Sequence, residues 1–256
     1  MSREQNMANV VTACLIIIGN EILSGRTQDK NLAHLALKLN EAGIQLREAR
    51  VIPDIEATIA QTVNACRTQF DYVFTTGGIG PTHDDITTAS IAKAFGVEVH
   101  RHPEAEAALR AHYAPENINE ARLKMADVPL GAELIPNAIS TAPGFRMENV
   151  YVMAGIPSIM QAMLDAILPR LKGGATVLSL SITTNLPEGA IAAGLTDIQN
   201  RYPTMDIGSY PMYERGNLST TLVLRSPDAR RNDAARNEVE QLISACGGQI
   251  IPTPGA

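Results

Sequence analysis

Two adjacent acids, Asp84 and Asp85, follow a glycine-rich turn, and this arrangement can bind phosphate with the help of a metal. Gly77, Gly78 and Gly80 let the backbone turn sharply and bring N–H groups close to an anion. Two carboxylates beside a phosphate repel it unless a divalent cation that prefers oxygen ligands (Mg²⁺, Mn²⁺ or Co²⁺) lies between them. The alternative is that both acids cap the helix that follows and complement its dipole.

Three further polar residues are candidates for the same site. Glu21 could supply a third acid to the metal or brace its own loop. His83 lies beside the acids in the sequence and could carry a proton or only line the loop. Lys124 could place a positive charge on a leaving phosphate or could be an ordinary surface lysine.

The elements that must position these residues are strands of a buried sheet. Residues Tyr72–Thr76 are uncharged, aromatic or β-branched, as in a strand covered on both faces, and Thr87–Phe95 has a helical pattern. The apolar run 10–18 stops at a second glycine loop, 19–25. Because ligands gather at the carboxyl ends of strands in α/β sheets, this loop and the loop 77–85 are expected to face one crevice.

The rest of the first 172 residues alternates between strand and helix patterns, which predicts a doubly wound α/β domain with a mostly parallel sheet over residues 10–172. Asp54 is expected to cap one of its helices. The predicted elements are a helix at 29–42, a strand at 44–52, a helix at 55–66, a strand at 97–100, helices at 103–113 and 119–126, a hairpin at 145–153 and a helix at 158–171.

A glycine-containing linker at 172–176 separates this domain from a smaller one. Strands at 177–184, 206–212 and 219–225 and helices at 188–201 and 228–246 give the order βαββα, which predicts a small α+β domain over residues 176–250. Residues 1–9 are polar and predict a flexible N-terminus.

The composition narrows the class of protein. The chain has 256 residues, 45% of them hydrophobic, and a net charge of −6, which disfavours a dedicated nucleic-acid surface. No apolar run approaches the roughly 20 residues of a membrane span, and a signal peptide is not expected. The three cysteines, Cys14, Cys66 and Cys246, lie in apolar patterns, which indicates reduced core thiols and a cytoplasmic location.

The motif Thr-Thr-Gly-Gly-Ile-Gly-Pro-Thr-His-Asp-Asp at 75–85, preceded by Gly-Asn-Glu-Ile-Leu-Ser-Gly at 19–25, resembles the molybdopterin-binding domain of molybdenum-cofactor biosynthesis proteins. The branch it resembles most is that of the CinA (competence/damage-inducible) proteins and of the amino-terminal half of eukaryotic FAD synthases. The tail of the chain is similar to the small KH-like domain of that branch. Further motifs of the branch follow in the expected order at 120–129, 136–137, 141–145 and 155–157.

The resemblance implies a set of functional residues. The acids Asp84 and Asp85, with Lys124, are implied to be catalytic, and Asp84, Asp85 and Glu21 to hold the metal. The residues implied to bind phosphate or the rest of the ligand are Gly19, Asn20, Thr76, Gly77, Gly78, Gly80, Pro81, Thr82, Asn137, Thr141, Pro143, Gly144, Gly155 and Pro157.

Two departures from the CinA pattern stand out: Ser140 replaces a glycine and Ile159 a glutamate. No amidase domain is expected, and therefore no deamidation of nicotinamide nucleotides. The resemblance leaves three functions open: a metal-dependent nucleotide pyrophosphatase acting on ADP-ribose or FAD-type substrates, a binder of molybdopterin in molybdenum-cofactor biosynthesis, or a nucleotide sensor without catalysis. It also implies a homo-oligomer with a small nucleotide or pterin phosphate as its ligand.

Overall fold

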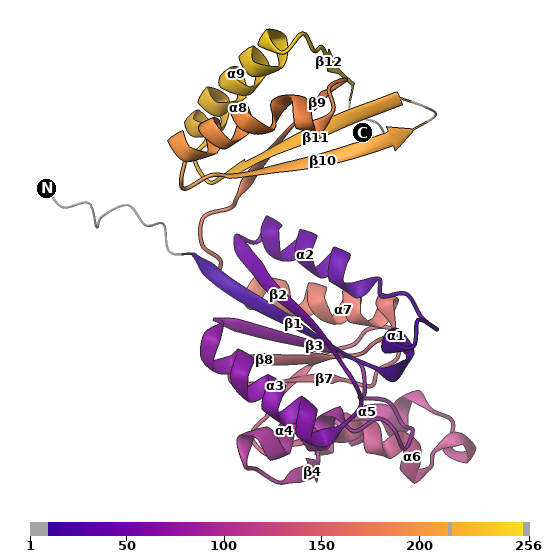
Figure 1. The fold of residues 1–256 in the computed structure, drawn as a ribbon. Helices are drawn as coiled ribbons and strands as arrows, with labels where there is room; N and C mark the ends of the chain where they lie inside the picture. Colours follow the sequence, from indigo (N-terminus) through magenta and orange to yellow (C-terminus); the bar gives the residue numbers. More distant parts are fainter. Residues whose placement is uncertain (1–9, 215–216, 253–256) are drawn as a thin grey trace, which may run out of the picture. The chain divides into compact units, whose positions relative to one another are not determined.

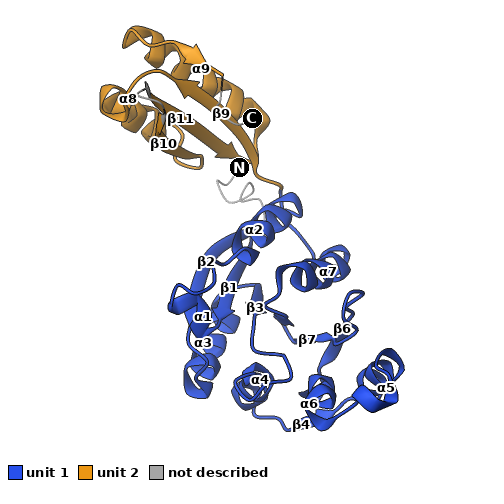
Figure 2. Ribbon diagram, turned by 90° about the vertical axis from the view of Figure 1, so that its right-hand side faces the viewer, with its two compact units in different colours: residues 1–175 blue, residues 176–256 orange. Residues whose placement is uncertain are grey.

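The computed structural model describes residues 10–214 and 217–252, and the chain divides into two compact units, residues 1–175 and 176–256 (Figures 1 and 2). The flexible N-terminus predicted at residues 1–9 lies outside the described residues. Each unit has a sheet and a hydrophobic core of its own.

The larger unit is built on a six-stranded sheet with the order β2-β1-β3-β8-β7-β6. The four strands β2, β1, β3 and β8 are mutually parallel, whereas β7 and β6 continue the sheet in antiparallel pairing. The prediction of a mostly parallel α/β sheet is therefore confirmed. The strands are β1 (Val11–Ile18), β2 (Ile44–Ile52), β3 (Tyr72–Thr76), β6 (Glu133–Ile135), β7 (Gly144–Met147) and β8 (Val150–Met153).

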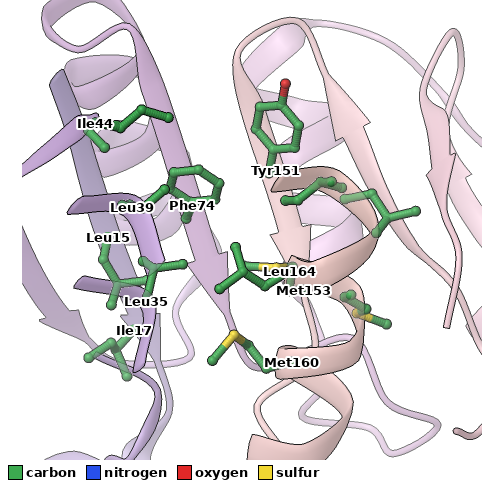
Figure 3. Close-up of a cluster of buried hydrophobic side chains, with 14 residues drawn as sticks. Leu15, Ile17, Leu35, Leu39, Ile44, Phe74, Tyr151, Met153, Met160 and Leu164 are labelled. Atoms are coloured by element: carbon green, nitrogen blue, oxygen red, sulfur yellow. The ribbon is translucent and has the colours of Figure 1, made fainter. Parts of the chain in front are cut away.

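Helices cover both faces of this sheet because alternate side chains of its buried strands point to opposite sides. On one face Ile17 and Phe74 pack with residues of α2 and α7 (Figure 3). On the other face Ile16 packs with residues of α3 and α4. The helices of this unit are α1 (Asn20–Leu23), α2 (Asn31–Glu41), α3 (Glu56–Gln69), α4 (Thr87–Phe95), α5 (Pro103–His112), α6 (Glu120–Leu123) and α7 (Pro157–Ile167), with 3₁₀ turns η1 (Pro115–Asn117), η2 (Lys124–Ala126) and η3 (Leu168–Arg170).

A side lobe inserted between α4 and β6 was predicted only in part. Its strand β4 (Val99–Arg101) pairs with β5 (Asp127–Pro129) in a separate two-stranded sheet, so the strand expected at 97–100 is not part of the main sheet. The pattern did not indicate β5 or β6, because strands of three residues carry almost no periodicity. This lobe places η2 and β5 beside the amino end of α4.

The smaller unit has an antiparallel sheet with the order β10-β11-β9-β12 and two helices. Its core joins Leu222 of β11 to Ile191 of α8 and Val239 of α9, so the two helices pack on one face of the sheet. The smaller α+β unit of the prediction is confirmed, with β12 as an added strand. Its elements are β9 (Leu178–Thr184), α8 (Glu188–Arg201), β10 (Asp206–Glu214), β11 (Asn217–Ser226), α9 (Ala229–Ala245) and β12 (Ile250–Ile251).

The cysteines differ from the expectation of three separate core thiols. Cys14 and Cys66 are buried with their sulfurs 3.5 Å apart, and we call them the thiol pair. Cys246 is exposed because it follows the last turn of α9, beyond the last buried position, Ile243. Among the described helices, none has the length and apolar character required to cross a membrane.

Candidate functional site

The glycine loop leaves the carboxyl end of β3 with a backbone that only glycine adopts easily. Gly77 has φ of 102° and Gly78 has φ of 69°. A Cβ at Gly77 would lie 2.1 Å from the carbonyl oxygen of Ile18, so the loop presses against the end of β1. Thr87 closes the loop, since its N–H donates to the Gly78 oxygen (2.9 Å) and its hydroxyl to the Gly77 oxygen (3.0 Å).

The two aspartates turn back onto Thr82 and do not cap the helix. The Thr82 hydroxyl oxygen lies 2.5 Å from Asp84 Oδ1 and 2.5 Å from Asp85 Oδ2, and the Thr82 N–H donates to Asp85 Oδ2 (2.8 Å). Helix α4 starts at Thr87, and its N-cap, Ile86, offers no side-chain hydrogen bond. The capping alternative is therefore wrong, and two carboxylates converge on one hydroxyl that has a single proton to donate.

Lys124 braces this acid pair from the side lobe. Its Nζ donates to the carbonyl oxygens of Thr82 (2.7 Å) and Asp85 (2.9 Å). The hydrogen bond from the Thr82 hydroxyl lowers the pKa of Asp84 most, followed by the bond from its own backbone N–H, with smaller effects of His83 and Lys124. The His83 side chain is 99% exposed, with Nδ1 4.0 Å from Asp84 Oδ1. Asp84 is therefore a carboxylate at neutral pH.

A cavity of about 230 Å³ opens beside the loop, between α4 and the side lobe. Gly80 and Asp85 of the glycine loop line it, together with Lys124 and with Asp127 of β5. The other lining residues are Ile79, Thr88, Ala89, Val99, Met125, Pro143 and Phe145. We call this the acid cavity.

A second cavity of about 60 Å³ lies at the same edge of the sheet, and we call it the small cavity. Thr76 lines it and pairs in register with Ile17, whose side chain belongs to the layer under α2 and α7. The single crevice expected from the sequence is therefore two cavities, which meet the glycine loop at Gly77 on one side and at Gly80 on the other. The other residues of the small cavity are Ile18, Glu21, Ile22, Thr27, Gln28, Asp29, Lys30, Asn31, Gly155 and Pro157.

The carboxylate of Glu21 lies apart from the aspartate pair. It folds over its own loop, 2.5 Å from the position of a Cβ on Gly19, and lines the small cavity. Within the described ranges, no group of three or more His, Cys, Asp or Glu side chains is placed to hold a metal. The paired oxygens of Asp84 and Asp85 still match the ligand preference of Mg²⁺. The metal site stays a prediction, and in this structure it would rest on these two residues.

Several residues implied by the resemblance shape loops. Asn137 is buried, donates to Ser140 Oγ (2.6 Å) and Ala142 O (2.9 Å), and accepts from the N–H groups of Ile139 and Ser140. All the hydrogen-bonding positions of its amide are thereby occupied within its loop. A Cβ at Gly144 would lie 2.4 Å from the Val152 oxygen, so this glycine allows β7 and β8 to pair closely.

The remaining implied residues lie at the edge of the sheet that carries the two cavities. Gly155 and Gly77 face each other, with a Cβ on Gly155 3.3 Å from the Gly77 Cα. Thr141 has a left-handed backbone, with φ of 67°. Pro81 is exposed at the tip of the glycine loop. A ligand role for these residues stays a prediction.

Two residues of this edge were missed or misassigned. Asp54 does not cap α3, whose N-cap is Ile55, and instead accepts a hydrogen bond from the N–H of Asn20 (2.8 Å). Asn31 starts α2, and the sequence pattern indicates only a helical position for it. The available signal was their position, since both follow strands β2 and β1 at the carboxyl edge, among polar residues.

A mostly parallel sheet with a glycine loop and two cavities at its carboxyl edge defines the larger unit as a small-molecule-binding α/β domain. The chain belongs to the family described as "Probable molybdopterin binding domain", whose pattern matches residues 14–173. Residues 176–247 match a second family, described as "FAD synthase, middle domain".

Individual relatives agree with this assignment. A protein of Pyrobaculum calidifontis is 36% identical over 211 residues, which cover 78% of this chain and 80% of the relative. A CinA-like protein of Desulfosudis oleivorans is 33% identical, covering 93% of this chain and 60% of that protein. A probable FAD synthase of Caenorhabditis elegans is 29% identical, covering 98% of this chain and 53% of that protein.

A solved structure supports the fold. The protein CinA from Thermoplasma acidophilum, described as having unknown function, matches with a TM-score of 0.60 and 33% identity. The match covers 64% of this chain and 99% of that one. The CinA-like assignment from the sequence is confirmed.

Proposed function

We propose that this protein is a metal-dependent nucleotide pyrophosphatase that cleaves the phosphoanhydride bond of ADP-ribose or of FAD-type dinucleotides. The observation that carries the proposal is the convergence of Asp84 and Asp85 on Thr82, next to a cavity that Asp85 and Lys124 line. A glycine loop alone would support only anion binding. Two carboxyl side chains beside it suit a ligand that brings a cation with its phosphates.

Each group has a distinct part in this proposal. The backbone N–H groups of the glycine loop bind phosphate oxygens, whereas the Thr82 hydroxyl donates its single proton to the acid pair and holds it beside the loop. Lys124 uses two of its three N–H donors on loop carbonyls, which leaves one for a phosphate oxygen. Asp84 and Asp85 hold the divalent cation, which when bound neutralises charge on the phosphates and lowers the pKa of a bound water.

The relatives support a nucleotide substrate. Two proteins named probable FAD synthase, from Caenorhabditis elegans and Caenorhabditis briggsae, match over 98% and 91% of this chain, respectively. The smaller unit also matches the middle domain of FAD synthase. This likeness extends over both units, which favours a ligand related to nucleotides.

The test is direct hydrolysis by the purified chain. ADP-ribose and FAD are incubated with Mg²⁺, Mn²⁺ or Co²⁺, and the release of AMP is followed by chromatography. We expect turnover that Asp84→Ala and Asp85→Asn abolish, whereas Glu104→Ala, an exposed acid on α5, retains it. No release of AMP above the level of the Asp84→Ala variant would contradict the proposal.

A second function is favoured by the family match itself, which is to a probable molybdopterin-binding domain. In that case the chain binds molybdopterin through the same loop and contributes to molybdenum-cofactor biosynthesis. A fluorescent pterin that copurifies with the chain, or micromolar binding of molybdopterin, would favour it. Tight nucleotide binding without hydrolysis would instead indicate a nucleotide sensor.

A further inference from the structure

The small cavity is lined by two buried polar side chains, each with an oxygen atom that has no hydrogen-bond partner. Asn31 is 3% exposed and Thr76 is 1% exposed. Neither Asn31 Oδ1 nor Thr76 Oγ1 has a hydrogen bond within the described part of the chain. Buried polar atoms without partners are uncommon because their lost hydration is not replaced. Both residues line the cavity, so a ligand that fills it is the candidate partner for these two oxygens.

The orientation of the Asn31 amide decides what it can recognise. Its Nδ2 donates to the carbonyl oxygen of Gly155 (2.9 Å), an atom that can only accept. This bond distinguishes the two ends of the amide and leaves Oδ1 free as an acceptor. Thr76 Oγ1 can both donate and accept. These two atoms therefore suit a ligand that offers both an N–H donor and an acceptor.

The other lining residues favour the same ligand. The Glu21 carboxylate has no hydrogen bond or ion pair among the described residues, and Lys30 is the one cationic side chain in the lining. Ile17 and Ile22 add apolar surface. Ile156 lies between two lining residues and is 60% exposed. An acceptor-rich hollow with apolar walls suits the amino edge of a planar heterocycle.

We propose that the small cavity binds the exocyclic amino group of a heterocycle and its neighbouring ring nitrogen. Asn31 Oδ1 accepts from the amine, and the Thr76 hydroxyl donates to the ring nitrogen. The cavity, at about 60 Å³, accommodates the edge of the ring. The phosphates of the same ligand then lie at the glycine loop, on the side where Gly77 lines the cavity. This placement rests on the proposed function, which puts the phosphates at that loop.

Adenine and pterin both have an amino group next to a ring nitrogen, so the experiment compares each with an analogue that has oxygen in place of the amine. Binding of ADP-ribose and of inosine diphosphate ribose is measured by calorimetry in EDTA. Binding of 6-hydroxymethylpterin and of 6-hydroxymethyllumazine is measured in the same way. We expect at least about tenfold tighter binding of the amino form in the pair that matches the natural ligand.

Two variants test whether the preference for the amino form arises in the small cavity. Thr76→Val removes a hydroxyl that has no protein partner while keeping the shape of the side chain, so the fold is retained and the preference should fall to about threefold or less. Asn31→Leu should also reduce it. Thr75→Val is the matched control: Thr75 is equally buried and unpartnered, but it pairs with Ile16 of the opposite layer and lines neither cavity.

The outcomes separate this inference from the proposed function. A preference that Thr76→Val reduces and Thr75→Val leaves unchanged supports the amino site even if no hydrolysis occurs. Equal binding of the amino and oxygen forms overturns it, even if ADP-ribose is hydrolysed. Lack of binding of all four compounds at millimolar concentration, or a preference unchanged in Thr76→Val, also overturns it.

Discussion

Replacement of Lys124 by methionine tests whether the side lobe holds the glycine loop in place. Methionine keeps most of the apolar stem but removes the ammonium group that donates to the carbonyls of Thr82 and Asp85. Lys124 belongs to η2 in the side lobe, whereas the two carbonyls belong to the glycine loop. The substitution therefore cuts a link between two segments about 40 residues apart in sequence.

The expected magnitude follows from the two bonds and their exposure. A hydrogen bond that involves a charged group contributes about 1.5–3 kcal/mol when buried. Lys124 is half-buried and the loop is open to water, so we take about 1 kcal/mol for each bond. Loss of both reduces the free energy that keeps the loop closed by about 2 kcal/mol, which corresponds to a factor of roughly 30 in the opening equilibrium.

Hydrogen exchange of the Thr82 amide measures that opening without any assumption about catalysis. This N–H donates to Asp85 Oδ2 in the closed loop, so it should exchange up to about 30-fold faster in Lys124→Met. Lys93→Met is the control, because Lys93 forms an exposed ion pair with Glu56. A change below about threefold in Lys124→Met, or an equal change in the control, would refute the bracing role of Lys124.

Three other substitutions or measurements test separate features. Gly77→Ala should lower the free energy of unfolding by about 3 kcal/mol or more in urea melts, because it adds a steric clash at a residue with an unfavourable φ. Gly25→Ala is the control: Gly25 has φ of 73° but open space around it, so this substitution should lower the free energy of unfolding clearly less. In the native protein a thiol reagent should label Cys246 alone, because the thiol pair is buried and burial raises the pKa of Cys14. Fast labelling of more than one thiol would contradict the structure. Thr82→Val should raise the pKa of Asp84, so the acid limb of the pH profile of AMP release should move to higher pH. An unchanged pH profile would show that this hydroxyl does not keep Asp84 ionised.

Much of the fold of the larger unit could be predicted from the sequence, because its buried strands and helices have strong patterns. The strand bounds Ile44–Ile52 and Tyr72–Thr76 and the helix Thr87–Phe95 agree with the structure. The side lobe could not be predicted in the same way. Its strands have three residues each, and their pairing depends on contacts about 30 residues apart that no local pattern records.

The candidate site was predictable at the level of loops and not at the level of cavities. The acids at 84 and 85 follow glycines after a buried strand, which is a local signal. The direction in which Glu21 folds depends on contacts within its own loop, and its separation from the acids cannot be read from spacing. The thiol pair is a similar case, since its members are 52 residues apart and meet because β1 packs against α3.

The central sheet divides the larger unit into two layers, and each cavity belongs to a different one. The small cavity lies in the layer of α2 and α7, while the acid cavity lies beside α4 and the side lobe. The cavities meet the glycine loop at Gly77 and at Gly80, respectively. On the proposed assignments, substitutions in the layer of the small cavity can therefore alter which heterocycle is bound while the acids of the other layer are left as they are. Under the same proposal, recognition of the heterocycle and cleavage of the phosphoanhydride depend on different layers of the sheet.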